Sequence, residues 1–91
     1  MSCAIETTRR FRKSIPDGHQ AAVVAALNAM RDGFSQPHAH SGLSIRKLGK
    51  NLYECRTGLA LRMVFEARKG VLTFDFCGNH DQVQAYLRNR R

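Results

Sequence analysis

The sequence predicts an α+β protein: a small antiparallel sheet of three to five strands, with N-terminal helices packed on one face and a short C-terminal helix. Short segments between Leu43 and His80 alternate apolar and polar residues and are separated by turn sequences, as in antiparallel strands with one buried face. The segment Asp17 to Asp32 instead repeats its apolar residues at helical spacing. The chain has 91 residues and is predicted to form a single domain over residues 1–91.

Three strands are predicted, over Leu52 to Arg56, Ala60 to Ala67 and Val71 to Cys77, with the turns Thr57-Gly58-Leu59 and Arg68-Lys69-Gly70 between them. Successive side chains point to opposite faces of a strand, so each strand supplies one set of residues to each face. The predicted core set is Tyr53, Cys55, Leu61, Met63, Phe65, Leu72, Phe74 and Phe76. The predicted outer set is Leu52, Glu54, Arg56, Arg62, Val64, Glu66, Val71, Thr73, Asp75 and Cys77, joined by Ser44 and Arg46 if the sheet begins at Leu43. This outer face is expected to be polar and partly cationic.

A helix over Asp17 to Asp32 is predicted to cover the apolar face of the sheet. Its apolar positions recur at spacings of four, three and four residues: Val23, Leu27, Met30 and Phe34. The alanines between them have high helix propensity and allow close packing. Ser14 or Asp17 is a possible N-cap, with Pro16 in the first turn.

Shorter elements are predicted at both ends of the chain. Ala4 to Thr8 is β-prone and is expected to add an edge strand to the sheet. Phe11 and Ile15 lie four residues apart, which predicts one or two helical turns. The C-terminal helix is expected to carry Val83 and Leu87, with Asn79 or Asp81 as its N-cap.

The charge of the chain indicates a polyanionic partner. Fifteen Lys and Arg residues against seven Asp and Glu residues give a net charge of +8, which favours a nucleic acid or an acidic protein surface. The basic residues form three clusters: Arg9, Arg10, Arg12 and Lys13; Arg46, Lys47 and Lys50; and Arg88, Arg90 and Arg91. The longest apolar run, Ala21 to Leu27, is far too short to cross a membrane, and the N-terminus lacks the apolar region of a signal peptide. A cytoplasmic protein without a membrane segment is expected.

The cysteines and histidines match no metal or disulfide motif. Cys3, Cys55 and Cys77 are odd in number and widely spaced, so we expect reduced thiols. His38 and His40 lie in a loop by composition, and no motif fixes the further ligands that a metal would need. Neither a metal nor an organic cofactor is expected.

Two arginines and one histidine of the predicted sheet have the chemistry needed to cleave RNA. Arg56 and Arg62 are predicted on the outer face, and His80 follows the end of the last strand. Cleavage requires activation of a 2′-hydroxyl, stabilisation of extra charge on the phosphate and protonation of the leaving 5′-oxygen. Arginine binds phosphate with directed hydrogen bonds, and histidine transfers protons near neutral pH.

Three segments of the chain resemble the RelE/ParE toxin superfamily of toxin–antitoxin pairs. They are LSIRKLGKNLYECRTG from Leu43, ALRMVFEA from Ala60 and VLTFDFCGNHDQV from Val71. The resemblance implies a small antiparallel sheet with helices on one face. It also implies one of two activities: RelE-, YoeB-, YafQ- and HigB-like members cut messenger RNA in the ribosomal A site, whereas ParE-like members inhibit DNA gyrase.

The resemblance also implies roles for individual residues. Arg62 matches the central-strand arginine that binds the phosphate, and Arg56 is a possible second phosphate ligand. His80 matches the histidine that acts as acid or base in YoeB-like and YafQ-like members. The residues implied in RNA binding are Arg46, Lys47 and Lys50, near the basic residues that stabilise the transition state in RelE-like members, and Tyr86, the candidate for base stacking.

The function expected from the resemblance is a toxin that acts as a ribosome-dependent endoribonuclease and represses translation. The alternatives are a ParE-like gyrase inhibitor and a degenerate member that binds RNA or a partner without cutting. The expected partners are the ribosome with its messenger RNA and a small antitoxin that is acidic where it contacts this chain. The toxin–antitoxin complex is also expected to bind promoter DNA, chiefly through the antitoxin.

Overall fold

The computed structural model of the protein describes residues 3–33, 44–58 and 60–90. Its strands are β1 (Ala4–Thr7), β2 (Arg46–Gly49), β3 (Leu52–Thr57), β4 (Leu61–Arg68) and β5 (Val71–Gly78). Its helices are α1 (Arg9–Ser14), α2 (Gln20–Gly33) and α3 (His80–Asn89). The predicted α+β class is confirmed, and the three predicted strands appear within about one residue of their expected bounds.

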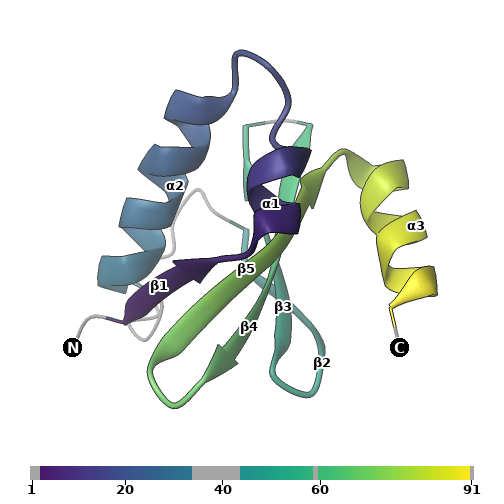
Figure 1. Ribbon diagram of the computed structural model, residues 1–91. Coiled ribbons are helices and arrows are strands. Elements are labelled where there is room, and N and C mark those ends of the chain that lie inside the picture. The colour runs from purple at the N-terminus through teal and green to yellow at the C-terminus, as the bar shows by residue number, and fades with distance from the viewer. Residues whose placement is uncertain (1–2, 34–43, 59, 91) are drawn as a thin grey trace.

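The five strands form one sheet in the order β1-β5-β4-β3-β2 (Figure 1). Strands β2 to β5 form the predicted antiparallel meander. The predicted edge strand is also present, but β1 runs parallel to β5, with Ala4 opposite Val71 and Thr7 opposite Phe74. The sheet is therefore mixed, because β1 runs in the same direction as β5 while the other neighbouring strands run in opposite directions.

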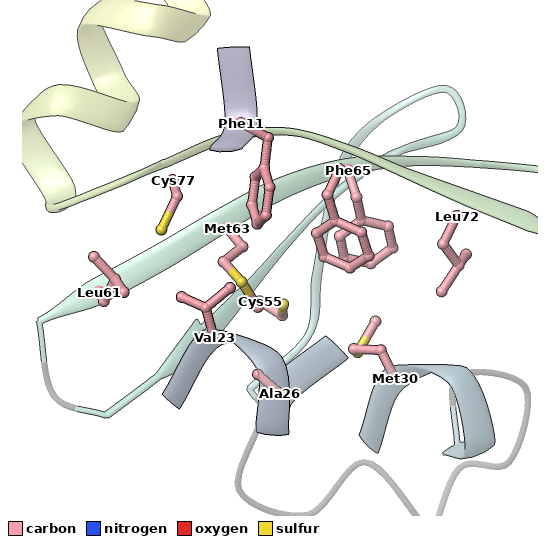
Figure 2. Close-up of a cluster of buried hydrophobic side chains, with 11 residues drawn as sticks. Phe11, Val23, Ala26, Met30, Cys55, Leu61, Met63, Phe65, Leu72 and Cys77 are labelled. Carbon is pink, nitrogen blue, oxygen red and sulfur yellow. The ribbon is translucent and has the colours of Figure 1, made fainter. Parts of the chain in front are cut away.

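Helices α1 and α2 bury one face of the sheet, as predicted. From α1 comes Phe11, and from α2 come Val23, Ala26 and Met30, all at most 5% exposed. Figure 2 shows these side chains meeting the sheet residues, which include Leu61, Met63, Phe65 and Leu72. Leu27 is only partly buried beside this cluster, and Phe34 lies outside the described residues.

Helix α2 begins at Gln20, three residues later than predicted. The backbone of Gly18 has φ +82°, a left-handed conformation that cannot start a right-handed helix. Asp17 and Gly18 instead form a turn after α1, which ends at Ser14. Neither Ser14 nor Asp17 is therefore placed to cap α2.

A β-bulge at Asp75 reverses the faces that the sequence predicts for the end of β5. Phe65 pairs with Phe74, whereas the preceding Val64 pairs with Phe76, so Asp75 is an extra residue on β5. Strict alternation fails after Asp75, and Phe76 joins the outer face while Cys77 joins the core. The predicted placement of Phe76 and Cys77 is wrong for this reason.

Helix α3 packs on the outer face of the sheet, opposite α2 (Figure 1). Its Val83 and Tyr86 form a second apolar cluster with Val64, and Phe76 packs against it. As predicted, the helix begins at an Asn79 cap, which forms a capping box with Gln82. The outer face is therefore partly apolar and covered, not wholly polar as the alternation suggested.

The cysteines in the described part of the chain are free thiols, as expected. Burial raises the pKa of Cys55 to about 12, with smaller effects of Cys77 and Glu54, and burial raises the pKa of Cys77 to about 11. Both thiols therefore stay protonated near neutral pH. Within the described residues, no helix has the length and apolar character needed to cross a membrane.

Candidate functional site

The sheet brings the three predicted catalytic residues to one end of the molecule. Arg56 on β3 lies directly opposite Arg62 on β4, and Arg62 lies opposite Gly78 on β5. His80 follows two residues after Gly78, as the first residue of α3, and is exposed. Neighbouring strands lie about 4.8 Å apart, so this register places the backbones of Arg56 and Arg62 and the start of α3 in one region.

Gly78 permits the close approach of α3 to the end of β5. A Cβ atom at this position would lie 2.8 Å from Oε1 of Gln82 and 3.1 Å from the ring of Phe76. The Gln82 side chain completes the capping box by accepting the backbone N–H of Asn79 at 2.9 Å. The glycine thus lets the helix start directly beside the strand, which fixes the backbone position of His80.

Arg62 is largely buried, contrary to the exposed position predicted for it. Its side chain is 16% exposed, and its Nη1 donates a hydrogen bond to Oε2 of Glu54 at 3.2 Å. Arg56 is exposed. Since a guanidinium group has five N–H donors, the bond to Glu54 leaves Arg62 with Nη2 and Nε donors for an anion.

Glu54 lies beside the candidate site, and the sequence did not single it out as a site residue. It is 1% exposed and lies between two arginines, with Oε2 3.2 Å from Arg62 and 3.6 Å from Nη2 of Arg46. Its Oε1 accepts no hydrogen bond from the residues that the structure describes. The available signal was its place on the same face as Arg46, Arg56 and Arg62, but alternation alone predicts the face and not the burial.

Of the three basic residues predicted to bind RNA, only Arg46 joins this region. Arg46 pairs with Glu54 in the sheet and its side chain is 58% exposed. Lys47 pairs with Tyr53, a residue packed against the core, so Lys47 belongs to the opposite face. Lys50 is exposed in the turn between β2 and β3, at the far end of β3 from Arg56.

Tyr86 packs α3 against the sheet and is 9% exposed. Its ring stacks on Phe76 with centroids 4.7 Å apart and an interplanar angle of 6°. Its hydroxyl donates to Oδ2 of Asp75 at 2.5 Å and accepts from Nε of Arg90 at 3.2 Å. Burial and the hydrogen bond to Asp75 raise the pKa of Tyr86. In this arrangement the ring is occupied by protein contacts.

A separate pocket of about 470 Å³ lies between α1, β5 and α3. Its lining includes Arg10, Phe76, Tyr86 and Arg90, and it includes none of the three predicted catalytic residues. The Arg10 guanidinium lies 5.8 Å from the centre of the Tyr86 ring and pairs with Asp75 at 3.4 Å. Arg10 therefore links α1 to β5, while Arg90 pairs with Glu66 on β4 and so links the end of α3 to that strand.

The described residues contain no group of three or more His, Cys, Asp or Glu side chains that could hold a metal ion. His38 and His40, the pair considered in the sequence, lie outside the described residues. The described side chains at the candidate site carry guanidinium groups, one carboxylate and one imidazole.

No protein-family model matches the sequence, and no curated protein matches it. Solved structures do match. The E. coli DinJ–YafQ toxin–antitoxin complex aligns with a TM-score of 0.71 at 12% identity, over 91% of this chain and 98% of that chain. A chain of the archaeal RelE–RelB complex from Pyrococcus horikoshii OT3 aligns with a TM-score of 0.68 at 16% identity, over 87% of this chain and 96% of that one. A chain of the RelB–RelE complex from Methanococcus jannaschii aligns with a TM-score of 0.64 at 14% identity, over 89% of this chain and 96% of that one. The predicted RelE-like fold is confirmed.

Proposed function

We propose that this RelE-fold protein is the toxin of a bacterial type II toxin–antitoxin system, and that it is a ribosome-dependent endoribonuclease that represses translation. One observation carries the proposal: the register that aligns Arg56, Arg62 and Gly78 on neighbouring strands, with His80 starting the next helix. In this arrangement two arginines would bind the phosphate and a histidine would transfer protons, as RNA cleavage requires. The fold similarity and the net charge of +8 support the same function.

The proposed reaction is attack of a ribose 2′-hydroxyl on the adjacent phosphate. The 2′-oxygen loses its proton and bonds to phosphorus, the bond to the 5′-oxygen breaks, and that leaving oxygen takes up a proton, which yields a 2′,3′-cyclic phosphate and a 5′-hydroxyl. His80 would supply the proton to the leaving oxygen or remove the one on the 2′-hydroxyl, with water serving in the other transfer, because an imidazole can both donate and accept a proton. Arg62 and Arg56 would hold the phosphate oxygens as their negative charge increases.

The remaining predicted RNA-binding residues take different roles in this proposal. Arg46 would bind a phosphate next to the cleaved one, because it shares the face of Arg62. Lys47 and Lys50 would contact RNA or ribosome away from the cleaved bond, given their positions in the sheet. Tyr86 would reach a base only after leaving Phe76 and Asp75, so we assign it to the packing of α3.

An antitoxin is the proposed protein partner. Several of the similar solved structures are complexes of a toxin with its antitoxin. The cationic charge of this chain would be matched by an acidic segment of such a protein, and the opposite charges would speed association. We also propose that the complex acts in the cytoplasm and binds its own promoter through the antitoxin.

Purified protein tests the proposed activity directly. The protein is added to messenger RNA in two forms, free and bound in a translating ribosome, and the RNA ends are mapped. We expect cuts within codons of the ribosome-bound RNA only. Inhibition of DNA gyrase supercoiling without RNA cuts would favour the ParE-like alternative, and a lack of both effects would favour a degenerate binding protein.

A further inference from the structure

The burial of the Glu54 carboxylate is not explained by a gain in the stability of the protein. Its side chain is 2% exposed, and its two cationic partners, Arg46 and Arg62, have side chains that are 58% and 16% exposed. Burying a carboxylate costs free energy unless all its acceptor sites are used. Only Oε2 receives a hydrogen bond from the described residues, while Oε1 receives none.

The charges around Glu54 suggest what the residue does. Arg56 and Arg62 face each other across β3 and β4, and like charges in such positions repel. A carboxylate beside Arg62 offsets this repulsion and accepts a directed hydrogen bond at Nη1. That bond fixes the rotation of the guanidinium group, since its planar donors are arranged in a rigid fork.

We propose that Glu54 is the positioning residue of the phosphate-binding site: from beneath the sheet surface it holds Arg62 by Nη1, which leaves Nη2 and Nε directed to a substrate phosphate. Glu54 itself, being buried, does not touch the RNA. The inference rests on the proposed ribonuclease function for its kinetic consequence. The structural consequence, that Glu54 immobilises the Arg62 side chain, holds whether or not the protein cleaves RNA.

The first test is Glu54→Gln, which preserves the shape and an acceptor oxygen but removes the charge. Steady-state cleavage of ribosome-bound RNA is measured at a temperature at which each variant is folded. We expect kcat to fall roughly 10- to 100-fold, as for a misplaced catalytic group, while KM for ribosomes is unchanged. A kcat within about twofold of the wild-type value would overturn the proposal.

Glu66→Gln is the matched control. Glu66 also pairs with two arginines, Arg68 at 3.2 Å and Arg90 at 3.4 Å, but it lies elsewhere on β4 and is not a neighbour of Arg62 in the sheet. We expect its kcat to match the wild-type value. An equal loss of kcat in Glu66→Gln and Glu54→Gln would mean that general loss of charge pairing, and not positioning of Arg62, is responsible.

A double-mutant cycle separates positioning from a general effect on structure. If Glu54 acts through Arg62, Glu54→Gln should lower the rate in the wild type but change it less than about twofold in an Arg62→Ala background. Losses that multiply in the double variant would show that Glu54 acts independently of Arg62, which contradicts the proposal.

Side-chain NMR of isotope-labelled protein tests the inference without catalysis. We expect a resolved Nη1–H signal of Arg62, assigned through Arg62→Lys, that broadens or averages in Glu54→Gln and is unchanged in Glu66→Gln. An identical Arg62 signal in wild type and Glu54→Gln would overturn the positioning role.

If Glu54→Gln does not fold, Glu54→Asp replaces it, because it keeps the charge but shortens the reach to Arg62. Failure of the wild type to cut RNA would refute the proposed function and leave this NMR result decisive for Glu54.

Discussion

Arg56 and Arg62 lie directly opposite each other on the antiparallel strands β3 and β4. Two like charges in this position are unfavourable in the absence of an anion. A phosphate bound between them would remove that repulsion, and Glu54 offsets part of it in the free protein through its bond to Arg62 at 3.2 Å. The arrangement therefore favours the anion-bound state over the free state.

Replacing Arg56 should raise stability and lower activity together. Arg56→Thr removes one of two opposed charges and adds a residue with high β propensity, so we expect a gain of roughly 0.2–1 kcal/mol in the free energy of unfolding. The same variant should cleave RNA more slowly, because one phosphate ligand is lost. Urea unfolding and the cleavage assay measure the two effects. A loss of stability in Arg56→Thr would contradict the like-charge account.

Replacing Arg62 should cost both stability and activity. Arg62→Ala leaves the buried Glu54 without its hydrogen-bond donor, and we expect a loss of roughly 2–3 kcal/mol in urea unfolding with the fold retained. Arg68→Ala on the same strand is the control, because Arg68 is 67% exposed and its pair with Glu66 should contribute less than about 1 kcal/mol. Equal losses in the two variants would refute the burial of the Glu54–Arg62 pair.

Two adjacent valines of α2 test the packing of the helix on the sheet. Val23 is 1% exposed in the core, whereas Val24 is 55% exposed. Val23→Asp would bury a carboxylate without a partner and should lower stability by several kcal/mol, roughly 3 or more. Val24→Asp should stay within about 0.5 kcal/mol, apart from helix propensity. Thermal melts that coincide for the two variants would mean that α2 presents a different face to the sheet.

The contact between Tyr86 and Asp75 predicts how stability changes at high pH. Burial and the hydrogen bond to Asp75 raise the pKa of Tyr86 in the folded protein above its ordinary value of 10.0. The stability from this contact is therefore fully present below pH 10 and is lost as pH rises through the folded pKa. Tyr86→Phe should be less stable than wild type by roughly 1.5–3 kcal/mol near neutral pH. That difference should shrink above about pH 10, and a difference independent of pH would contradict the assigned hydrogen bond.

The bounds of the strands could be predicted because alternating apolar and polar residues mark each strand and turn sequences mark its ends. The core residues Leu61, Met63 and Phe65 lie on the expected face. The end of β5 could not be predicted, since a bulge at Asp75 depends on where β4 and β5 pair and no residue type marks it. Because of the bulge, Phe76 packs against α3 on the outer face, whereas strict alternation would have placed its side chain on the opposite face.

The sequence predicted which residues share one face of the sheet at the candidate site, but it did not predict how deeply they are buried. The resemblance implied Arg56, Arg62 and His80 as site residues; the strands that carry the two arginines are neighbours, and His80 begins the helix after β5. Glu54 is buried beside the side chains of Arg46 and Arg62, which pair with it. Tertiary contacts of this kind leave no periodic signal in the sequence.

We propose that His80 and the two arginines form the site of an RNA-cutting toxin. Induced expression in a bacterium, followed by mapping of the 5′ ends of abundant messages, tests whether they do. His80→Ala is compared with His19→Ala, which removes another exposed histidine, on the turn before α2, the helix that packs on the opposite face of the sheet from Arg62. We predict growth arrest with cuts inside translated codons for wild type and His19→Ala, and loss of both effects for His80→Ala. Growth arrest without cuts, or cuts that persist in soluble His80→Ala, would contradict the account.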